Sequence, residues 1–242
     1  MYILVGFLAL KAGRTEDPSE AMAWLGSGWG KAVVAAMAVG FLFYGIWRLA
    51  SAWLDSDGKG SDLKGLGPRI AAAGSGIIHL GFCYYAVKIA LGSGGRGGGS
   101  GAESGTATAL SFPGGEFAIY VAGAVLVGAG LVQLDQAVRL RFLKHMKAGT
   151  GSPPWICWTG RIGYAARGVI FLVAAWLLVH AGMHHNPGEA GGVGDSLAAV
   201  PDALRPFIAA GLGVFGLLSL IEAKYRKINT PRVGAEFRRM TA

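Results

Sequence analysis

A short segment near residue 180 holds the side chains most able to bind a metal ion. His180 and His184 are four residues apart, so a helix would place both on one face. His185, Glu189 and Asp195 follow them in the chain. Imidazole and carboxylate groups at this spacing could bind zinc or copper. The alternative is that the histidines close the C-terminal end of a helix, where positive charge is favoured. We expect this second arrangement and predict no cofactor.

Arg167 is the charged residue whose position most suggests a function. It lies about one and a half turns inside an apolar run, where an unpaired cation costs about 2.5–3.5 kcal/mol. We expect an ion pair with Glu222, which lies near the same end of the next apolar run, and Asp135 is the second candidate partner. Such a pair would lock the helices together, and the alternative is a proton or ion relay.

Two further polar residues, Gln133 and His79, complete a candidate intramembrane polar network with Arg167, Glu222 and Asp135. Gln133 lies in the same apolar run as Asp135. His79 lies in a different run, where we interpret it as a hydrogen-bonded packing residue, with a proton carrier as the alternative.

Three glycines, Gly211, Gly213 and Gly216, match the dinucleotide-binding pattern G-x-G-x-x-G, but they lie within an apolar run. The pattern binds a pyrophosphate only where it follows a strand and opens a helix. We therefore interpret these glycines as positions where two helices approach closely. The sequence has no Walker A lysine, no HExxH pair and no GxSxG elbow. We expect no enzymatic activity.

The composition excludes an ordinary soluble domain. The chain has 242 residues, of which 52% are hydrophobic and only 15% are charged, whereas soluble domains average about 25% charged residues. Glycine is abundant, at 41 residues, but shows no Gly-X-Y period, which excludes collagen. The apolar content also excludes a disordered chain. Together these features predict a polytopic membrane protein.

The apolar runs predict an all-α membrane bundle with six spans. Five runs reach the about 20 residues that a helix needs to cross roughly 30 Å of hydrocarbon: Ala32–Trp53, Ile70–Leu91, Phe117–Val138, Ile162–Ala181 and Leu204–Ala223. A sixth run, Tyr2–Leu10, has about half this length, and we interpret it as a truncated first span. A signal-peptide core is the alternative, although no basic segment precedes it. The runs are continuous rather than alternating, which favours helices over a β-barrel.

The net charge of +8 is distributed unevenly along the chain. In the six-span arrangement, sixteen of the 22 Lys and Arg residues fall on one side of the membrane. Cytoplasmic segments carry such an excess. We therefore predict that both termini are cytoplasmic, and that the positive charge does not form a nucleic-acid surface.

Three parts of the sequence align with one another. Residues 161–170 align without gaps on residues 69–78, and residues 1–4 fit the same register, which makes Lys11, Lys88 and His180 equivalent. The second helices align as well, over Gly45–Ala52, Gly130–Ala137 and Gly216–Ala223. We predict three parallel helical-hairpin repeats at residues 1–55, 68–147 and 158–227, followed by a basic cytoplasmic tail at 228–242. Parallel repeats make an inverted-repeat transporter less expected.

The repeats differ in their first helices and in their outer loops. The first repeat has no counterpart of Arg161–Val169, so we expect its first span to be truncated or to be completed upstream of Met1. The second repeat contains a glycine-rich segment, Gly92–Gly105, which we expect to be a flexible loop. We expect short interfacial helices in the three outer loops, at Ser19–Leu25, Thr106–Phe112 and Ser196–Leu204.

The segment Gly163–Gly168, with the sequence GYAARG, opens an apolar run. With the three-repeat, six-span arrangement, it resembles the bacterial membrane-protein family catalogued as domain of unknown function 1206. The resemblance covers nearly the whole chain, although GYAARG is intact only once: the second repeat has Ala72 and Ser75 in place of Tyr164 and Arg167. The resemblance implies a bacterial inner-membrane location and a fold, and it implies no activity.

Our leading hypothesis is a non-enzymatic integral inner-membrane protein that acts as a scaffold or accessory subunit. Its expected partners are the lipid bilayer and other membrane proteins or a second copy of itself, with no nucleic acid. The alternative is a small-solute or ion transporter or channel, in which the candidate polar network lines a cytoplasmic vestibule. Local pairing of the polar residues would favour the first hypothesis, and convergence on a hydrated cavity would favour the second.

Overall fold

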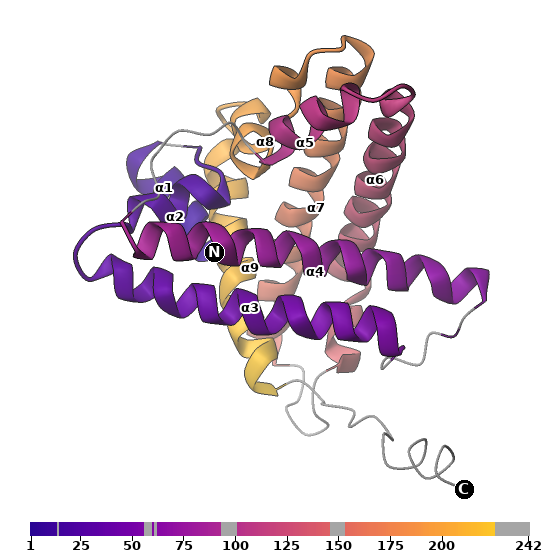
Figure 1. Ribbon diagram of the computed structural model, residues 1–242. Helices are drawn as coiled ribbons and strands as arrows, with labels where there is room; N and C mark the ends of the chain where they lie inside the picture. The colour runs from indigo at the N-terminus through magenta and orange to yellow at the C-terminus, as the bar shows by residue number, and fades with distance from the viewer. Residues whose placement is uncertain (14, 56–59, 61, 93–100, 146–152, 226–242) are drawn as a thin grey trace, which may run out of the picture. The chain divides into compact units, whose positions relative to one another are not determined.

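The computed structural model describes residues 1–13, 15–55, 60, 62–92, 101–145 and 153–225. Within these ranges the regular structure is helical, without a strand. Five of the described helices, labelled in Figure 1, are long and apolar enough to cross a membrane: α3 (Gly30–Leu54), α4 (Leu63–Ala90), α6 (Gly115–Arg139), α7 (Pro154–Met183) and α9 (Arg205–Tyr225). The protein is therefore a polytopic helical membrane bundle, as the apolar runs predicted.

The sixth apolar run forms α1 (Tyr2–Ala12), a helix of 11 residues. At 1.5 Å per residue it is about 17 Å long, roughly half the thickness of the hydrocarbon core. The helix ends at Gly13, whose φ of 61° lies in the left-handed region that glycine adopts without strain.

Two membrane helices begin earlier than the apolar runs predicted. α4 begins at Leu63 rather than at Ile70, because the Asp62 side chain accepts a hydrogen bond from the Gly65 backbone N–H at 3.1 Å and caps the helix. α7 begins at Pro154 rather than at Ile162, with proline at the first helical position, where its missing N–H costs nothing. Hydropathy locates the apolar centre of a span but misses a polar or aromatic first turn.

Short helices lie in the connecting segments, as predicted from their modest apolarity. They are α2 (Pro18–Trp24), α5 (Gly101–Leu110) and α8 (Val193–Ala199), with two 3₁₀ helices, η1 (Arg141–His145) and η2 (Pro187–Glu189). α5 begins inside the glycine-rich segment Gly92–Gly105, so the prediction of a loop is wrong for residues 101–105. Residues 93–100 of that segment, and the predicted tail at 228–242, lie outside the described residues.

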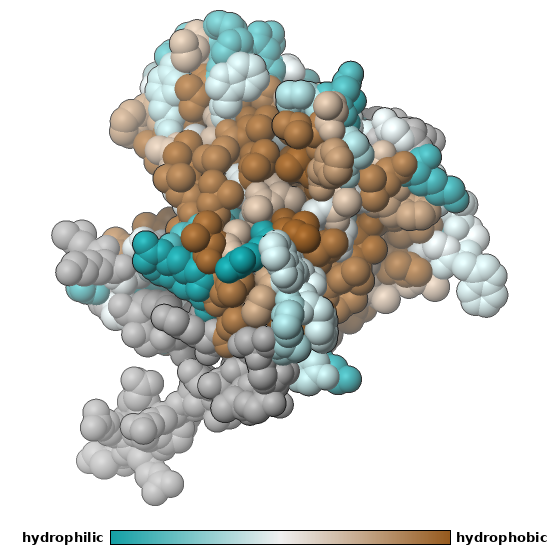
Figure 2. Space-filling view, turned by 180° about the vertical axis from the view of Figure 1, so that it is seen from behind, coloured by the Kyte–Doolittle hydropathy of each residue, from teal (hydrophilic) through white to brown (hydrophobic). Residues whose placement is uncertain are grey.

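The long helices expose large apolar side chains. Phe43 in α3, Val125 in α6 and Leu220 in α9 are each more than 60% exposed. Figure 2 shows apolar side chains over broad areas of the helices. A soluble protein rarely leaves such wide apolar areas in water, so these faces are suited to contact lipid.

The chain divides into two compact units. One contains residues 1–22 and 96–227, and the other contains residues 23–95 and 228–242. The first unit holds α1, α6, α7 and α9 with α5, α8 and η2, and the second holds α3 and α4. Predicted repeat 1 contributes α1 to the first unit and α3 to the second. Predicted repeat 2 contributes α6 to the first unit and α4 to the second.

In the second unit, α3 and α4 run antiparallel and meet at two glycines. A Cβ on Gly45 would lie 2.9 Å from the Leu80 side chain and 3.2 Å from the Gly76 carbonyl oxygen. A Cβ on Gly76 would lie 2.7 Å from the Leu49 side chain and 3.0 Å from the Gly45 carbonyl oxygen. Each glycine therefore accepts the leucine that lies one turn after the glycine of the other helix, which allows the backbones to approach closely.

In the first unit, α6 and α7 make the same contact. A Cβ on Gly130 would lie 2.9 Å from Leu172 and 3.2 Å from the Gly168 carbonyl oxygen. A Cβ on Gly168 would lie 2.9 Å from Leu134 and 3.1 Å from the Gly130 carbonyl oxygen. In the register of the sequence alignment, these four residues are the counterparts of those that join α3 to α4.

α9 packs against α1 through the corresponding glycine. A Cβ on Gly216 would meet Ile3 at both its side chain and its backbone, and Gly6 of α1 lies against Ala209 and Gly213 of α9. By the alignment, Gly216 is equivalent to Gly45 and Gly130, and Ile3 is equivalent to Leu80 and Leu172. The closest antiparallel pairs thus join a second helix of one predicted repeat to a first helix of another.

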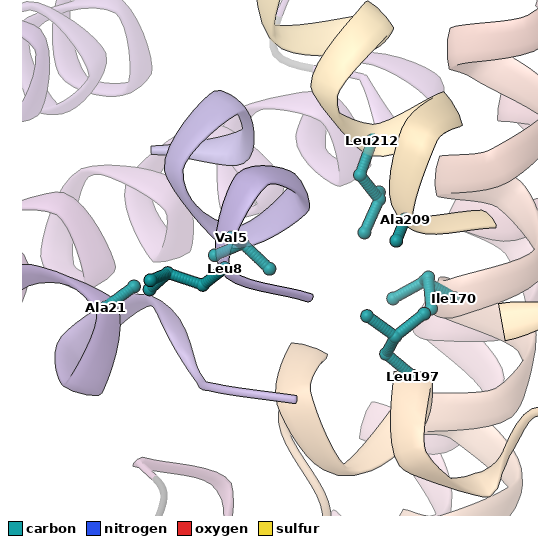
Figure 3. Packing of buried hydrophobic residues seen from close by; sticks show 7 residues of the cluster. All are labelled: Val5, Leu8, Ala21, Ile170, Leu197, Ala209 and Leu212. Atoms are coloured by element: carbon teal, nitrogen blue, oxygen red, sulfur yellow. The ribbon is translucent and has the colours of Figure 1, made fainter. Parts of the chain in front are cut away.

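The core of the first unit lies between α1 and its neighbours. Val5 is completely buried and Leu8 is 2% exposed, although α1 is short. The cluster comprises Val5, Leu8, Ala21, Ile170, Leu197, Ala209 and Leu212, contributed by α1, α2, α7, α8 and α9 (Figure 3). Because α1 is shorter than a full span, it has less surface of its own to bury. The short helices α2 and α8 add contacts that hold it in place.

Candidate functional site

Arg167 lies within a cage of three aromatic rings. Its guanidinium carbon is 4.7 Å from the centre of the Phe215 ring, 4.8 Å from that of Phe171 and 5.2 Å from that of Tyr2. The cage brings together α7, α9 and α1. A guanidinium over aromatic faces is stabilised by the ring quadrupoles, more strongly where water is excluded. The Arg167 Nε is buried and has no hydrogen-bond partner among the described residues.

Glu222, the expected partner of Arg167, accepts a hydrogen bond from Tyr164. The Tyr164 hydroxyl donates to Glu222 Oε1 at 3.0 Å. The contacts described for Arg167 are with aromatic rings. Tyr164 lies about one turn before Arg167 on α7, and it is Tyr164 that reaches the last turns of α9. The two charges lie in the same region of the first unit, and the contacts described for each are with different residues.

Asp135 pairs with two arginines close to it in the chain. Arg139 Nε and Arg141 Nε lie 2.9 Å from Asp135 Oδ1 and Oδ2, respectively. The pairs close the C-terminal end of α6, where cations are favoured. Gln133 is partly buried on the same helix. Asp135 therefore belongs to an end-of-helix ion cluster.

His79 belongs to the second unit, whereas the other four candidate residues belong to the first. Its Nδ1 donates to the Ser75 carbonyl oxygen at 2.7 Å, one turn earlier on α4. Three aromatic rings surround the imidazole: the ring centre of Tyr44 is at 4.5 Å, Phe41 at 6.1 Å and Phe82 at 6.2 Å. These contacts are those of a packed, hydrogen-bonded histidine.

The histidines at the end of α7 converge on one carboxylate. His180 Nδ1 lies 2.9 Å and His184 Nδ1 lies 2.8 Å from the same atom, Glu189 Oε2. The two imidazole rings are 4.1 Å apart and nearly perpendicular. Hydrogen bonds from the imidazoles hold the pKa of the Glu189 carboxyl below its ordinary value, so it is ionised and accepts from both rings. We call His180, His184 and Glu189 the histidine cluster.

Neighbouring residues hold the histidine cluster in place. The Asn186 amide donates to Glu189 Oε1 at 3.1 Å, and its oxygen accepts from the Gly188 backbone N–H at 3.2 Å. His185 points to a different helix, with its Nε2 2.6 Å from Glu116 Oε1 at the start of α6. Of the three histidines singled out in the sequence, two therefore face one point and the third ties α7 to α6. Asp195 instead caps α8, accepting from the Gly192 backbone N–H at 3.0 Å.

A basic residue stacked on an aromatic ring occurs at the end of each first helix. Lys11 Nζ lies 5.4 Å from the ring centre of Phe7, and Lys88 Nζ lies 5.7 Å from that of Tyr84. The equivalent His180 stacks on Trp176 at 5.2 Å. The alignment predicted the equivalence of the basic residues, and the structure adds the aromatic residue one turn earlier.

Asp17 is a buried acid that the sequence analysis did not single out. It is 6% exposed, and its Oδ1 accepts from the Gly194 backbone N–H at 2.7 Å, in the first turn of α8. Burial raises the pKa of the Asp17 carboxyl, against the lowering effect of this hydrogen bond. The sequence Asp17-Pro18-Ser19-Glu20 is typical of a local helix start, and Glu20 does accept from the Asp17 backbone N–H at 3.1 Å. No local signal pairs the Asp17 side chain with a helix far along the chain.

The chain is similar to proteins whose function is not assigned. The family model described as Domain of Unknown Function (DUF1206) matches residues 1–55, 70–139 and 162–226, well over half of the chain. A relative from Bacillus subtilis (strain 168), Uncharacterized protein YxxB, is 27% identical over 239 residues, covering 93% of this chain and 86% of the relative. No solved structure matches. The chain belongs to the family described as Domain of Unknown Function (DUF1206).

Proposed function

We propose that this protein is a non-enzymatic integral membrane protein that acts through helix packing, as a scaffold or an accessory subunit of a membrane assembly. One observation carries the proposal: the described hydrogen bonds and ion pairs of Glu222, Asp135 and His79 are local, each within one predicted repeat. Asp135 contacts arginines of its own helix end, Glu222 contacts Tyr164, and His79 contacts the backbone of its own helix. Local engagement is the arrangement of structural polar residues rather than of a shared translocation path.

The groove described along α3 and α4 supports the same proposal. It has a volume of about 930 Å³ and is lined almost entirely by apolar residues such as Ile46, Leu49 and Trp53. Arg69 is its charged member, and the guanidinium already donates to the carbonyl oxygens of Ala52 and Trp53 at 2.8 and 3.0 Å. None of the five candidate network residues lines this groove.

The proposal includes three parallel repeats in a bacterial plasma membrane, with both termini in the cytoplasm. The recurring glycine–leucine contacts and the three regions matched by the family model support the repeats. The excess of Lys and Arg on one side supports the orientation. Fusions of alkaline phosphatase and of a fluorescent protein after Asn186 and after Ala242 test it. We expect phosphatase activity only at Asn186 and fluorescence only at Ala242, and the reverse pattern would overturn the orientation.

Reconstitution tests the functional proposal. Purified full-length protein in phosphatidylethanolamine–phosphatidylglycerol vesicles is expected to leave the permeability to H⁺, Na⁺ and K⁺ equal to that of empty vesicles. Cross-linking in the native membrane is expected to capture one membrane protein in a fixed ratio. A transporter or channel is favoured by one observation, the buried Arg167 Nε without a hydrogen-bond partner among the described residues. Flux that Arg167→Gln abolishes, in a variant that still folds, would replace the scaffold proposal with a transporter.

A further inference from the structure

We propose that His180, His184 and Glu189 bind a divalent transition-metal ion of the zinc, copper and nickel class, at the end of α7. The inference is independent of the scaffold proposal. The sequence alone favoured a helix-capping role for the histidines. The structure adds a carboxylate that the sequence could not place: one oxygen of Glu189 contacts both imidazoles.

The geometry of the histidine cluster suits a metal ion. One ligand atom from each of the three residues lies within 4.8 Å of the other two. Both Nδ1 atoms already lie within 2.9 Å of Glu189 Oε2. Ligands about 2.0–2.2 Å from a tetrahedral zinc ion are themselves separated by about 3.3 Å. Small rotations of the two imidazoles would therefore open the cluster enough to hold an ion at its centre.

The ligand set matches this class of metal. Two imidazole nitrogens and one carboxylate oxygen are the protein ligands of many zinc sites that keep a fourth position for water. Imidazole favours zinc, copper and nickel, whereas magnesium and calcium prefer ligand sets made of oxygen. The three side chains are 39%, 49% and 32% exposed, so an ion can enter from solvent and one coordination position can remain open.

The cluster is oriented before any ion binds. Asn186 holds the second carboxylate oxygen, and η2 fixes Glu189 one short turn beyond α7. Trp176 stacks on His180 and limits the rotation of its ring. Such second partners orient metal ligands, and their loss typically weakens binding about 10–100-fold. Glu116 near His185 adds a second negative charge to this end of the unit.

Binding of an ion requires a free lone pair on each Nδ1. In the histidine cluster, each Nδ1 carries the hydrogen that it donates to the Glu189 carboxylate. An ion therefore binds the tautomer of each imidazole in which the hydrogen lies on Nε2.

The same end of the other first helices lacks the cluster. Lys11 and Lys88 replace His180, and the position of His184 in the second repeat is Gly92. In the described residues, His180, His184 and Glu189 form the one group of three potential ligands. These helices therefore provide internal controls for a site confined to α7.

Isothermal titration of the full-length protein in detergent, purified without a histidine tag, tests the proposal. We expect one Zn²⁺ or Cu²⁺ ion per chain and no binding of Mg²⁺. Electron paramagnetic resonance of the Cu²⁺ form is expected to show coupling to two imidazole nitrogens. His180→Gln, His184→Gln and Glu189→Gln should each weaken binding at least about tenfold, because each removes one ligand.

The control variants are His185→Gln and His79→Gln, which leave the cluster intact and should keep the wild-type affinity. Circular dichroism and gel filtration establish that each variant is folded. Equal binding by wild type and by the double variant His180→Gln/His184→Gln would overturn the proposal. So would the absence of saturable binding to the folded wild-type protein.

Discussion

The α3–α4 pair and the α6–α7 pair share the same packing at their centres but carry different polar residues toward the ends of their helices. In both, two glycines and two leucines at equivalent positions interlock, with hypothetical Cβ contacts that agree within about 0.2 Å. α3 and α6 also end at equivalent residues, Asp55 and Leu140, both in the left-handed region with φ of 48° and 52°. The centres of the two pairs are thus nearly the same structure.

The polar residues of the two pairs differ. Where α7 has Tyr164 and Arg167, α4 has Ala72 and Ser75, and where α7 has His180, α4 has Lys88. Arg167 binds an aromatic cage and Tyr164 reaches Glu222, whereas the Ser75 backbone accepts from His79. The shared centre fixes how two helices pack, and the variable ends are where a particular role can arise.

The largest expected effect concerns the shared centre. Gly168→Leu in α7 and Gly76→Leu in α4 place a side chain against the backbone of the paired helix. Each should lower the free energy of unfolding by about 2–3 kcal/mol or more, because the helices must separate. The measurement is SDS-induced unfolding in mild detergent, followed by circular dichroism.

Two glycines of the same helix pairs, one in α4 and one in α6, provide controls for these substitutions. A Cβ on Gly74 in α4 or on Gly128 in α6 would have no neighbour within 4 Å. Gly74→Leu and Gly128→Leu are therefore expected to cost much less than the substitutions at the contact. If the contact and control substitutions are equally harmful, the glycines do not hold the pairs together. If only one pair is sensitive, the two pairs are not equivalent.

The next effect concerns Tyr164, Arg167 and Glu222, which have no counterpart in α3–α4. Tyr164→Phe and Glu222→Gln should each destabilise the protein, and their effects should be coupled by about 1–2 kcal/mol, as expected for a hydrogen bond to a charged group. Arg167→Gln and Glu222→Gln should instead be additive. A double-mutant cycle on the unfolding free energy measures both. Strong coupling of Arg167 with Glu222 would instead support the ion pair that the sequence predicts.

The sequence predicted the fold more fully than the site, for a physical reason. Lipid exposure imposes long apolar helices, and a close approach imposes glycine at fixed spacing, so both leave local patterns. The partners of Arg167 and Asp17 depend on which turn of a distant helix lies opposite, and no local pattern encodes this. The histidine cluster was partly predictable. The spacing of His180 and His184 is visible in the sequence, but the position of Glu189 depends on the turn after Met183.

Exchanging the equivalent basic residues is a smaller test of the variable ends. His180→Lys gives α7 the residue found in α4, and Lys88→His makes the reverse change. His180→Lys should abolish Zn²⁺ binding with little loss of stability, since a lysine stacks on the aromatic residue at the equivalent positions. Lys88→His should create no binding, because Gly92 stands where His184 would be needed. A gain of binding by Lys88→His would show that one histidine at this position suffices.

The smallest expected effect is a dependence of the stability of the first unit on pH, which the α3–α4 pair is not expected to share. Hydrogen bonds from the histidines lower the pKa of Glu189, so its stabilising contribution is present above the ordinary carboxyl range and is lost as the pH falls through the lowered pKa. Burial raises the pKa of Asp17, so its contribution is present below its ordinary range and is lost as the pH rises through the raised pKa. The two carboxyl groups thus give opposite slopes in the same unit.

Two isosteric variants separate the opposing contributions. Asp17→Asn keeps an oxygen that can accept from Gly194 but removes the charge, so it should stabilise the unit near neutral pH and remove the loss of stability with rising pH. Glu189→Gln should remove the opposite slope at low pH. Hydrogen exchange of α8 and of the end of α7, measured from about pH 2.5 to pH 7 so that it covers the lowered and the raised pKa, reports both. If Asp17→Asn instead destabilises the unit at neutral pH, the ionised carboxylate at the start of α8 is worth more than its burial costs.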